Sequence, residues 1–354
     1  MNATLTALHS AIPSNKFYPP HIDENQSLFR SRLIEDVLPG KHHKTKIIAI
    51  EAQAGQGKTT LAYQYITHHN HNHIWYQIGK EDADPVVLLS GLLHSLNNTL
   101  TTFSSPQLEN IILRGEIGPL DLQRCANILL ADVDRHLHTN LYIVFDDLHL
   151  ISHAEMTNQL LAYLLDTSPP RMHFVLTSRH PFELKSKTIR NRSSVSFLNT
   201  HDLALNSSEI EILFNDVFRR SISVADARKI EDITSGWVMG IVLAAHPMSG
   251  SRSIEKANST NFQILGSPSQ KDMLEYFQDE IFKCIPEKYH LPFLKLSFVD
   301  EIHANLAKRI TGITEIDTIL QDLTRENLFI YNLDPNYTLF RFHHFFQEFL
   351  QVRA

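Results

Sequence analysis

The stretch AQAGQGKTTLAYQYI, residues 52–66, follows the apolar run IIAIE and strongly limits how this chain can fold. A loop that cradles phosphate needs a buried strand, a glycine turn whose backbone N–H groups face the anion, a lysine, a hydroxyl for Mg²⁺ and then a helix. Residues 47–50 predict the strand, and the apolar spacing of residues 61–66 predicts an amphipathic helix. The segment therefore predicts the strand–loop–helix unit of an α/β P-loop NTPase.

The glycines and the lysine of this loop suit a bound nucleotide. Gly55 and Gly57 can adopt the positive φ and the close approach that a β-carbon would block. Lys58 would reach the β- and γ-phosphates, and Thr59 would bind Mg²⁺. The other loop positions expected to line the nucleotide are Ala54, Gln56 and Thr60. The first glycine of the usual pattern is Ala52 here, so the alternative is a glycine-rich turn that contains a lysine by chance.

Length, charge and cysteine content exclude several classes of protein. At 354 residues the chain can form two or three domains and bury a core without disulfides. Cys125 and Cys284 form no C-x-x-C pair, which predicts neither a disulfide nor a thiolate metal site and fits a reducing compartment. The formal charge of −7 argues against a dominant nucleic-acid surface, so we expect no direct DNA binding by this chain. The absence of a signal-peptide pattern and of a long apolar run predicts a cytoplasmic protein with no membrane contact.

Strand-like and helix-like runs alternate from about residue 46 to 197, which is typical of a parallel sheet with helices on both faces. The apolar runs IIAIE, HIWYQI, LYIVF and HFVLTS predict its strands. Short helices, a Ser-, Gly- and Asn-rich segment, further helices and two β-like runs around an Asp-Pro-Asn turn follow. We expect a nucleotide-binding domain with an N-terminal arm at 1–200, a helical domain at 201–250, a linker at 251–270 and a winged-helix-like domain at 271–354.

Two aspartates end the strand LYIVF, at the sheet edge where the phosphate loop begins. Asp146 would hold Mg²⁺, and Asp147 would orient or deprotonate the attacking water. Paired aspartates can also form an ordinary solvated turn, but the GKTT loop favours the catalytic interpretation. Arg179 follows the next strand and would bind the γ-phosphate, with a surface ion pair as the alternative. His149 could order the attacking water or simply close the turn.

The run HHNHNH, residues 68–73, has the composition of a metal-binding tract but not its setting. Metal sites fix their imidazoles by packing and by hydrogen bonds to further partners. These histidines instead end the predicted loop helix, where they can face the negative end of its dipole. We expect a solvated loop that binds no metal.

The succession of motifs resembles the MalT-type branch of the STAND ATPases, the large LuxR-like ATP-dependent transcriptional activators. The resemblance extends over nearly the entire chain. The matching family elements are R-x-R-L at residues 30–33, the A-P-A-G-x-G-K-T-T loop at 52–60, W…D-x-D-P at Trp75 and 82–85, D-D-x-H at 146–149 and L-T-S-R at 176–179.

The resemblance implies roles for residues outside the predicted sheet. The family's G-W-P element appears as Gly236-Trp237-Val238, so Trp237 and Val238 are expected near the base, although the adenine-packing proline is missing. The family element R-Y-H-x-L-F-x-x-F-L corresponds to residues 341–350, in which His343 would contact the β-phosphate of ADP. A histidine that merely begins a helix, and the neighbouring His344, are the alternatives. Arg32 of the R-x-R-L element is expected to contribute to the nucleotide site.

The resemblance also implies a switch. ADP would hold the sheet and winged-helix domains in a closed resting state, whereas ATP with Mg²⁺ and an inducer would favour an open, self-associating state that slow hydrolysis resets. The family's inducer-binding repeats and C-terminal DNA-binding domain do not occur in this sequence, so we expect a module of a longer regulator, or a short form that acts through a partner. The alternatives are an ATPase acting on a small substrate or partner protein, with turnover of about 1–10³ s⁻¹, and a scaffold with a degenerate nucleotide site.

Overall fold

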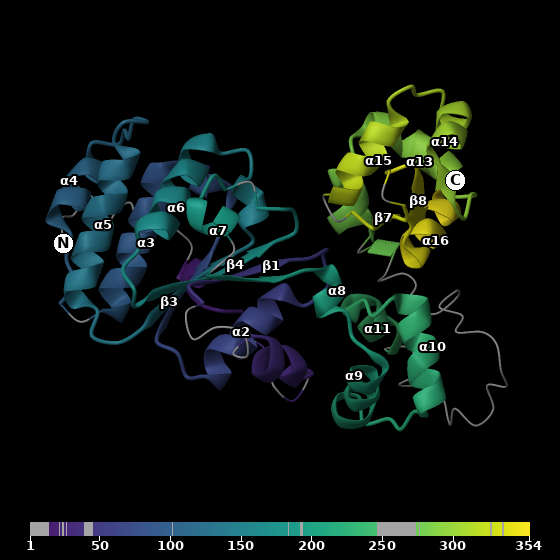
Figure 1. Ribbon diagram of the computed structural model, residues 1–354, viewed down its shortest axis with the longest axis horizontal. Helices are drawn as coiled ribbons and strands as arrows, with labels where there is room; N and C mark the ends of the chain where they lie inside the picture. Colours follow the sequence, from purple (N-terminus) through teal and green to yellow (C-terminus); the bar gives the residue numbers. More distant parts are fainter. Residues whose placement is uncertain are drawn as a thin grey trace. The chain divides into compact units, whose positions relative to one another are not determined.

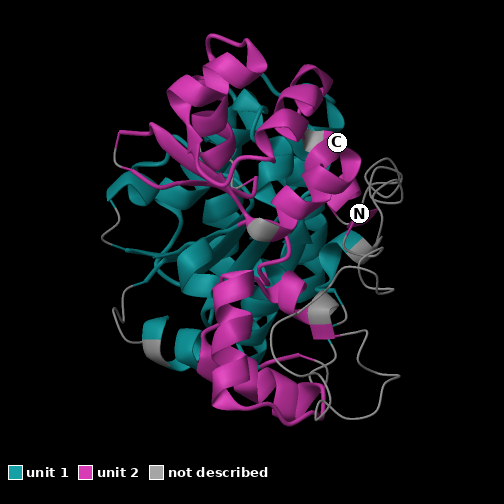
Figure 2. Cartoon of the chain, turned by 90° about the vertical axis from the view of Figure 1, so that its right-hand side faces the viewer, with its two compact units in different colours: residues 1–24, 29–52, 58–203 teal, residues 25–28, 53–57, 204–354 magenta. Residues whose placement is uncertain are grey.

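The computed structural model describes residues 14–20, 22, 25, 27–38, 45–100, 102–182, 184–191, 194–245, 274–275, 277–325, 328–334 and 336–354. The chain divides into two compact units (Figure 2). Unit 1 comprises residues 1–24, 29–52 and 58–203, and unit 2 comprises residues 25–28, 53–57 and 204–354. The phosphate loop, residues 53–57, therefore belongs to the same unit as the C-terminal half of the chain. The expected linker at 251–270 lies outside the described residues.

Unit 1 is built on a parallel sheet of five strands in the order β2-β3-β4-β1-β5 (Figure 1). The strands are β1 (Ile47–Glu51), β2 (His73–Gln77), β3 (Leu141–Asp146), β4 (Met172–Ser178) and β5 (Val195–Leu198). The first four confirm the predicted sheet, whereas β5 was not predicted because its four residues are too few to give a clear pattern. Strand β4 lies between β1 and β3, so the phosphate loop and the two aspartates leave the sheet on either side of β4.

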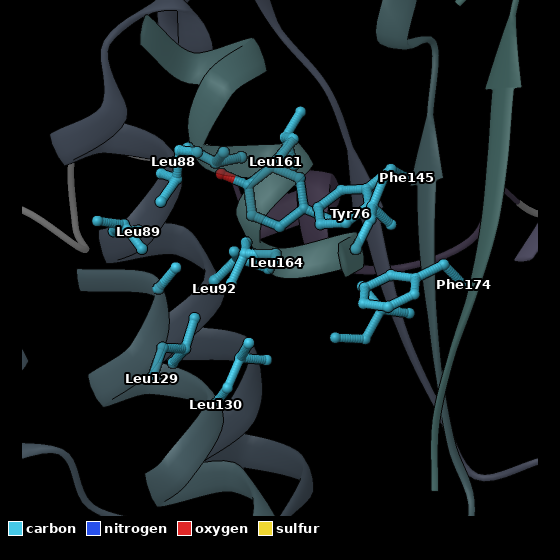
Figure 3. Close-up of a cluster of buried hydrophobic side chains, with 14 of the residues drawn as sticks. Tyr76, Leu88, Leu89, Leu92, Leu129, Leu130, Phe145, Leu161, Leu164 and Phe174 are labelled. Atoms are coloured by element: carbon cyan, nitrogen blue, oxygen red, sulfur yellow. The ribbon is translucent and has the colours of Figure 1, made fainter. Parts of the chain in front are cut away.

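The strands alternate their side chains between two apolar layers. Figure 1 shows α2 on one face of the sheet and α3, α5 and α6 on the other. On the three-helix side, Tyr76, Phe145 and Phe174 pack against leucines of these helices (Figure 3). On the α2 side, Trp75 and Val144 pack against residues of α2 and of η3. Strands of a parallel sheet that is covered on both faces have continuous apolar sequences, which is why these strands could be predicted from the sequence.

The helical elements of unit 1 are short apart from those that cover the sheet. They are η1 (Ser14–Phe17), η3 (Arg32–Val37), α2 (Lys58–His68), η4 (Lys80–Ala83), α3 (Pro85–Thr99), α4 (Pro106–Leu113), α5 (Leu122–His136), η5 (Leu148–Ile151), α6 (Glu155–Thr167), α7 (Lys187–Asn191) and α8 (Thr200–Leu203). None of the described helices of the chain combines the length and the apolar character needed to cross a membrane.

The turn after β2 gives a physical reason for the D-x-D-P stretch. Asp82 is fully buried, accepts a hydrogen bond of 2.8 Å from the Tyr76 hydroxyl, and pairs with the ammonium of Lys16 in η1. Asp84 caps α3 by accepting a backbone N–H of its first turn, and Pro85 occupies the first helical position. Residues 14–17 of the N-terminal arm are thus held against the rest of unit 1 by a buried ion pair.

Unit 2 consists of a helical segment and a winged-helix-like module. The helical segment contains α9 (Ser207–Ile212), η6 (Leu213–Val217), α10 (Val224–Thr234) and α11 (Val238–Ala245). The module contains η9 (Phe277–Ile281), η10 (Phe282–Cys284), η11 (Glu287–Tyr289), α13 (His290–Leu296), β6 (Ile302–His303), α14 (Ala304–Thr311), α15 (Ile316–Arg325), β7 (Ile330–Asn332), β8 (Leu339–Phe342) and α16 (His344–Arg353). The three strands form an antiparallel sheet in the order β6-β8-β7. The prediction missed β6, which has only two residues.

The histidine run after α2 is more ordered than a solvated loop. The ring of His71 stacks on Tyr142 with centroids 3.9 Å apart, and Tyr142 stacks in turn on His173 at 4.7 Å. Asn70 and Asn72 are exposed, so the solvated-loop prediction fits them but is wrong for His71. In the described part of the chain, no three His, Cys, Asp or Glu side chains are arranged to hold a metal. The packing arises because Tyr142 and His173 are paired residues near the starts of the neighbouring strands β3 and β4, a pairing that their distance in the sequence does not reveal.

This stack should make the stability of unit 1 depend on pH. Burial, and then the neighbouring histidines, lower the pKa of His71 to about 4. A histidine whose pKa is lower in the folded state stabilises the fold fully above its unfolded pKa of about 6.5. That contribution is lost as the pH falls from about 6.5 towards 4. We therefore expect thermal stability to decline over this range.

The variant His71→Gln should show a smaller drop in melting temperature between pH 7.5 and pH 5 than the unmodified chain. His153 is exposed, so His153→Gln is the matched control and should keep the original drop. Equal drops in all three proteins would contradict the interpretation of the stack.

Candidate functional site

The carboxylate of Asp146 is the centre of a hydrogen-bonded group at the carboxyl edge of the sheet. Asp146 ends β3 and is 1% exposed. The hydroxyl of Thr59, in the first turn of α2, lies 3.0 Å from both carboxylate oxygens. The hydroxyl of Thr177, on the adjacent strand β4, donates to Oδ1 at 2.5 Å. A hydroxyl and a carboxylate held together in this way provide two oxygen ligands of the kind that Mg²⁺ prefers.

Burial makes the charge of Asp146 costly. Desolvation first, and the neighbouring Asp147 second, raise the pKa of Asp146 to about 6, against the opposing hydrogen bonds from Thr177 and Thr59. A buried carboxylate that remains ionised at neutral pH is under-compensated until a cation binds. The site therefore favours a cation beside Thr59 and Asp146.

Lys58 is the buried cation of the site. It is 7% exposed, and its ammonium donates to the carbonyl of Ala52 at 2.7 Å, across the start of the loop. Burial, and then the charge of Arg179, lower the pKa of Lys58 to about 8, while Asp147 and Asp146 act in the opposite direction. Because the charged form of Lys58 is desolvated and only partly compensated by carboxylates, an added anion such as phosphate would stabilise it.

The residues after β3 and β4 face the same group. Asp147 adopts a left-handed backbone with φ 65°, and its N–H donates to the Thr177 hydroxyl at 2.9 Å. Nδ1 of the partly buried His149 lies 3.7 Å from Asp147 Oδ1, and desolvation lowers the pKa of His149 to about 3, so its ring is neutral at physiological pH. Arg179 lies close enough to lower the pKa of both Lys58 and His149. These charged groups thus act on one another electrostatically within unit 1.

The loop itself, in unit 2, has the backbone that a phosphate cradle needs. Gly55 has φ 72° and Gly57 has φ 86°. A β-carbon at residue 57 would meet no atom within 4 Å, so that side of the loop is open. The carbonyl of Ala54 accepts the Trp237 indole N–H at 2.9 Å, and the carbonyl of Gly55 accepts the Met239 N–H at 3.0 Å. Positive φ at two glycines is the backbone that a loop needs when its N–H groups bind a phosphate.

Other predicted site residues have partners within the protein. Trp237 is fully buried, and Val238 begins α11 directly after it. His343 is 2% exposed and lies 3.2 Å from the Thr234 carbonyl through Nε2. Arg32 donates to the carbonyl of Asp202 at 3.0 Å. For His344, the position of the side chain lies outside the described residues. Whether any of them contacts a nucleotide stays a prediction.

One residue of the site, Thr177, and one hydrogen bond, that of Trp237 to the loop, are not predicted by the sequence. Thr177 ends an apolar strand, and a hydroxyl in that position could have suggested a partner for the neighbouring aspartates. The hydrogen bond of Trp237 to the loop joins residues 183 positions apart, and no local pattern signals it.

Comparison with known families agrees with this arrangement. The family described as the MalT winged helix domain matches residues 278–354, and the family described as nephrocystin 3, N-terminal, matches residues 25–179. The first match confirms the winged-helix module, and the second covers the strands from β1 to β4 and the loop between them.

Curated relatives confirm the resemblance to MalT-type regulators. The HTH-type transcriptional regulator MalT of Vibrio parahaemolyticus is 26% identical over 342 residues, which cover 96% of this chain and 36% of the relative. The serine/threonine-protein kinase PknK of Mycobacterium tuberculosis is 24% identical over 345 residues, covering 96% of this chain and 30% of the relative. The chain thus spans about a third of the length of these relatives.

A solved structure confirms the fold. The Walker-type ATPase of Pyrococcus abyssi superposes with a TM-score of 0.57 at 12% identity, covering 91% of this chain and 94% of that chain. The fold of the chain is therefore that of a P-loop NTPase followed by helical segments and a winged helix. Such a fold supports nucleotide binding, typically with Mg²⁺.

The raised pKa of Asp146 leads to a test of the Mg²⁺ site. An acid whose pKa is higher in the folded state destabilises the fold once it ionises, so the cost grows from about pH 4 and is complete above about pH 6. Asp146→Asn removes this cost. At pH 7.5 without nucleotide, its free energy of unfolding should equal or exceed that of the unmodified chain, while nucleotide binding should lose its dependence on Mg²⁺.

Urea unfolding and calorimetry with and without Mg²⁺ measure both effects. Asp132 provides the contrast, because it is a buried carboxylate that pairs with Arg135, and Asp132→Asn should lower stability by about 1–3 kcal/mol. Unchanged Mg²⁺ dependence in Asp146→Asn would show that the carboxylate does not hold the ion.

Proposed function

We propose that the chain is the nucleotide-binding switch module of a MalT-like, LuxR-type regulator of the STAND class. ADP binds the resting state, ATP with Mg²⁺ binds a state that self-associates, and slow hydrolysis returns the module to rest. Nucleotide exchange acts by differential affinity, since a ligand shifts an equilibrium only by as much as it binds one state better than the other.

The main support for this proposal is that the phosphate loop and the winged-helix module lie in the same compact unit, unit 2. The phosphate loop and His343 of the winged-helix module belong to one compact unit, although residues 53–57 and 343 are far apart in the sequence. A nucleotide held by the loop is therefore held by the unit that also contains the winged helix. This arrangement supports a role in which the nucleotide reports to the winged-helix module.

His343 provides the chemistry for contact with a phosphate. The Phe345 N–H donates to Nδ1 of His343 at 3.3 Å, so the proton resides on Nε2, which donates to the Thr234 carbonyl. That carbonyl also accepts the Trp237 N–H at 3.0 Å. If His343 donated its Nε2–H hydrogen bond to a β-phosphate instead, the Thr234 carbonyl would keep the Trp237 N–H as its partner. The exchange costs little, which suits a residue that senses the nucleotide.

The division into domains follows from the same proposal. Residues 1–200 would bind nucleotide, 201–250 and 271–354 would form the helical and winged-helix domains, and 251–270 would link them. An inducer and DNA would be bound by other parts of a longer protein, and the module would work in the cytoplasm. The alternative is a stand-alone ATPase acting on a small substrate or partner protein, and it gains no support from the buried positions of Trp237 and His343 in unit 2.

Opposite nucleotide preferences in two variants test the switch. His343→Ala should weaken ADP binding more than ATP binding, by about 1–3 kcal/mol of coupling, because the donor to the β-phosphate is removed. Arg179→Ala should weaken ATP more than ADP, because its guanidinium would serve the γ-phosphate.

Calorimetry of both variants with both nucleotides gives the four affinities. Lys229→Ala, which removes an exposed positive charge in α10, is the control and should change neither affinity. Equal losses of ADP and ATP affinity in both site variants would leave a plain nucleotide-binding protein without a switch.

A further inference from the structure

The carbonyl groups of the phosphate loop are held by one short segment of unit 2. Trp237 donates its indole N–H to Ala54 at 2.9 Å, and Met239 donates its backbone N–H to Gly55 at 3.0 Å. Both donors stand at the start of α11. Met239 uses an N–H that has no partner inside its own helix, as is usual for the first turn.

These two bonds fix the direction of the loop's own donors. A trans peptide is planar, and its carbonyl and the following N–H point in opposite directions. Holding the carbonyls of Ala54 and Gly55 therefore aims the N–H groups of Gly55 and Gln56 away from α11. Glycine at residue 55, with φ 72°, would otherwise let these peptides rotate. Backbone N–H groups aimed at one point are what a phosphate loop uses to bind its anion.

Trp237 is itself rigidly placed by the winged-helix module. Its ring is fully buried, and the rings of Phe277, Phe329 and His343 have centroids 5.4, 4.9 and 5.5 Å away. A β-carbon at Gly240 would lie 2.5 Å from the Trp237 ring, so the helix leaves no other room there. Any displacement of the module must therefore move the indole.

The backbone carbonyl of Thr234 provides a second connection between Trp237 and the winged-helix module, through His343. It accepts the backbone N–H of Trp237 at 3.0 Å and the Nε2–H of His343 at 3.2 Å. The chain of contacts thus runs from His343 through Thr234 and Trp237 to Ala54, and all its members lie in unit 2. It consists of hydrogen bonds and buried ring contacts, without a solvent-exposed step.

We propose that Trp237 is a positioning residue that aims the phosphate-binding N–H groups of the loop and makes their direction depend on the winged-helix module. This inference rests on the proposed function in so far as the loop binds nucleotide. It assigns to Trp237 an action on the loop, in contrast to the contact with the base that the G-W-P resemblance implies. The winged helix then controls affinity through the loop as well as through His343.

The two tryptophans of the chain allow a matched test. Trp75 is 2% exposed and Trp237 is fully buried, but in the described part of the chain the indole N–H of Trp75 has no hydrogen-bond partner. Trp237→Phe and Trp75→Phe therefore remove similar volumes, while only the first removes the bond to the loop. We expect Trp237→Phe to weaken both ADP and ATP binding about three- to tenfold, the effect of one hydrogen bond, and Trp75→Phe to leave them unchanged.

Titration with ADP by calorimetry separates the possible failures. If neither the unmodified chain nor Trp75→Phe binds ADP, the proposed function is wrong. If both bind ADP and a folded Trp237→Phe binds it equally well, the positioning role is wrong. Circular dichroism and urea unfolding establish that each variant is folded.

An isostere keeps the test valid if Trp237→Phe does not fold. Benzothienylalanine at residue 237, in the Trp75→Phe background, keeps the ring size and replaces the N–H by sulfur. It should show the same loss of ADP affinity, and full affinity would overturn the proposal.

Discussion

The contact between the Thr59 hydroxyl and the Asp146 carboxylate is the interaction around which the site is organised. It ties the first turn of α2 to the end of β3, although β4 separates β3 from β1 in the sheet. Thr177 of β4 completes the connection by donating to Asp146 and accepting from the N–H of Asp147. The strand order thus determines which hydroxyl can orient both aspartates, and the buried apolar layers on the two faces of the sheet keep that order.

The same burial that fixes these groups leaves their charges poorly compensated. The pKa of Lys58 is lowered and that of Asp146 is raised, each mainly by desolvation. An anion beside Lys58 and a cation beside Asp146 would relieve both costs together. The uncompensated charges of Lys58 and Asp146 therefore lower the free energy of unfolding of the ligand-free protein. A nucleotide with Mg²⁺ carries the anion and the cation that would compensate them.

The sequence predicted the sheet and the loop because their signals are local. Continuous apolar runs indicated β1 to β4, and the order of glycine, lysine and threonine indicated the phosphate loop. What it could not predict depends on long-range contacts: the short strands β5 and β6, the stacking of His71 on Tyr142, and the bond from Trp237 to Ala54. The family resemblance identified Trp237 as a site residue, but its hydrogen bond became evident only from the packing of unit 2.

The central claim is that this loop binds a nucleotide and that ADP is the ligand of the resting state. Identification of the nucleotide released when the purified chain is denatured tests it most directly. We expect ADP in a near-equimolar amount from the unmodified chain and none from Lys58→Ala, with Lys229→Ala resembling the unmodified chain. The claim would be contradicted if the unmodified chain released no nucleotide and also failed to bind added ADP or Mg²⁺–ATP.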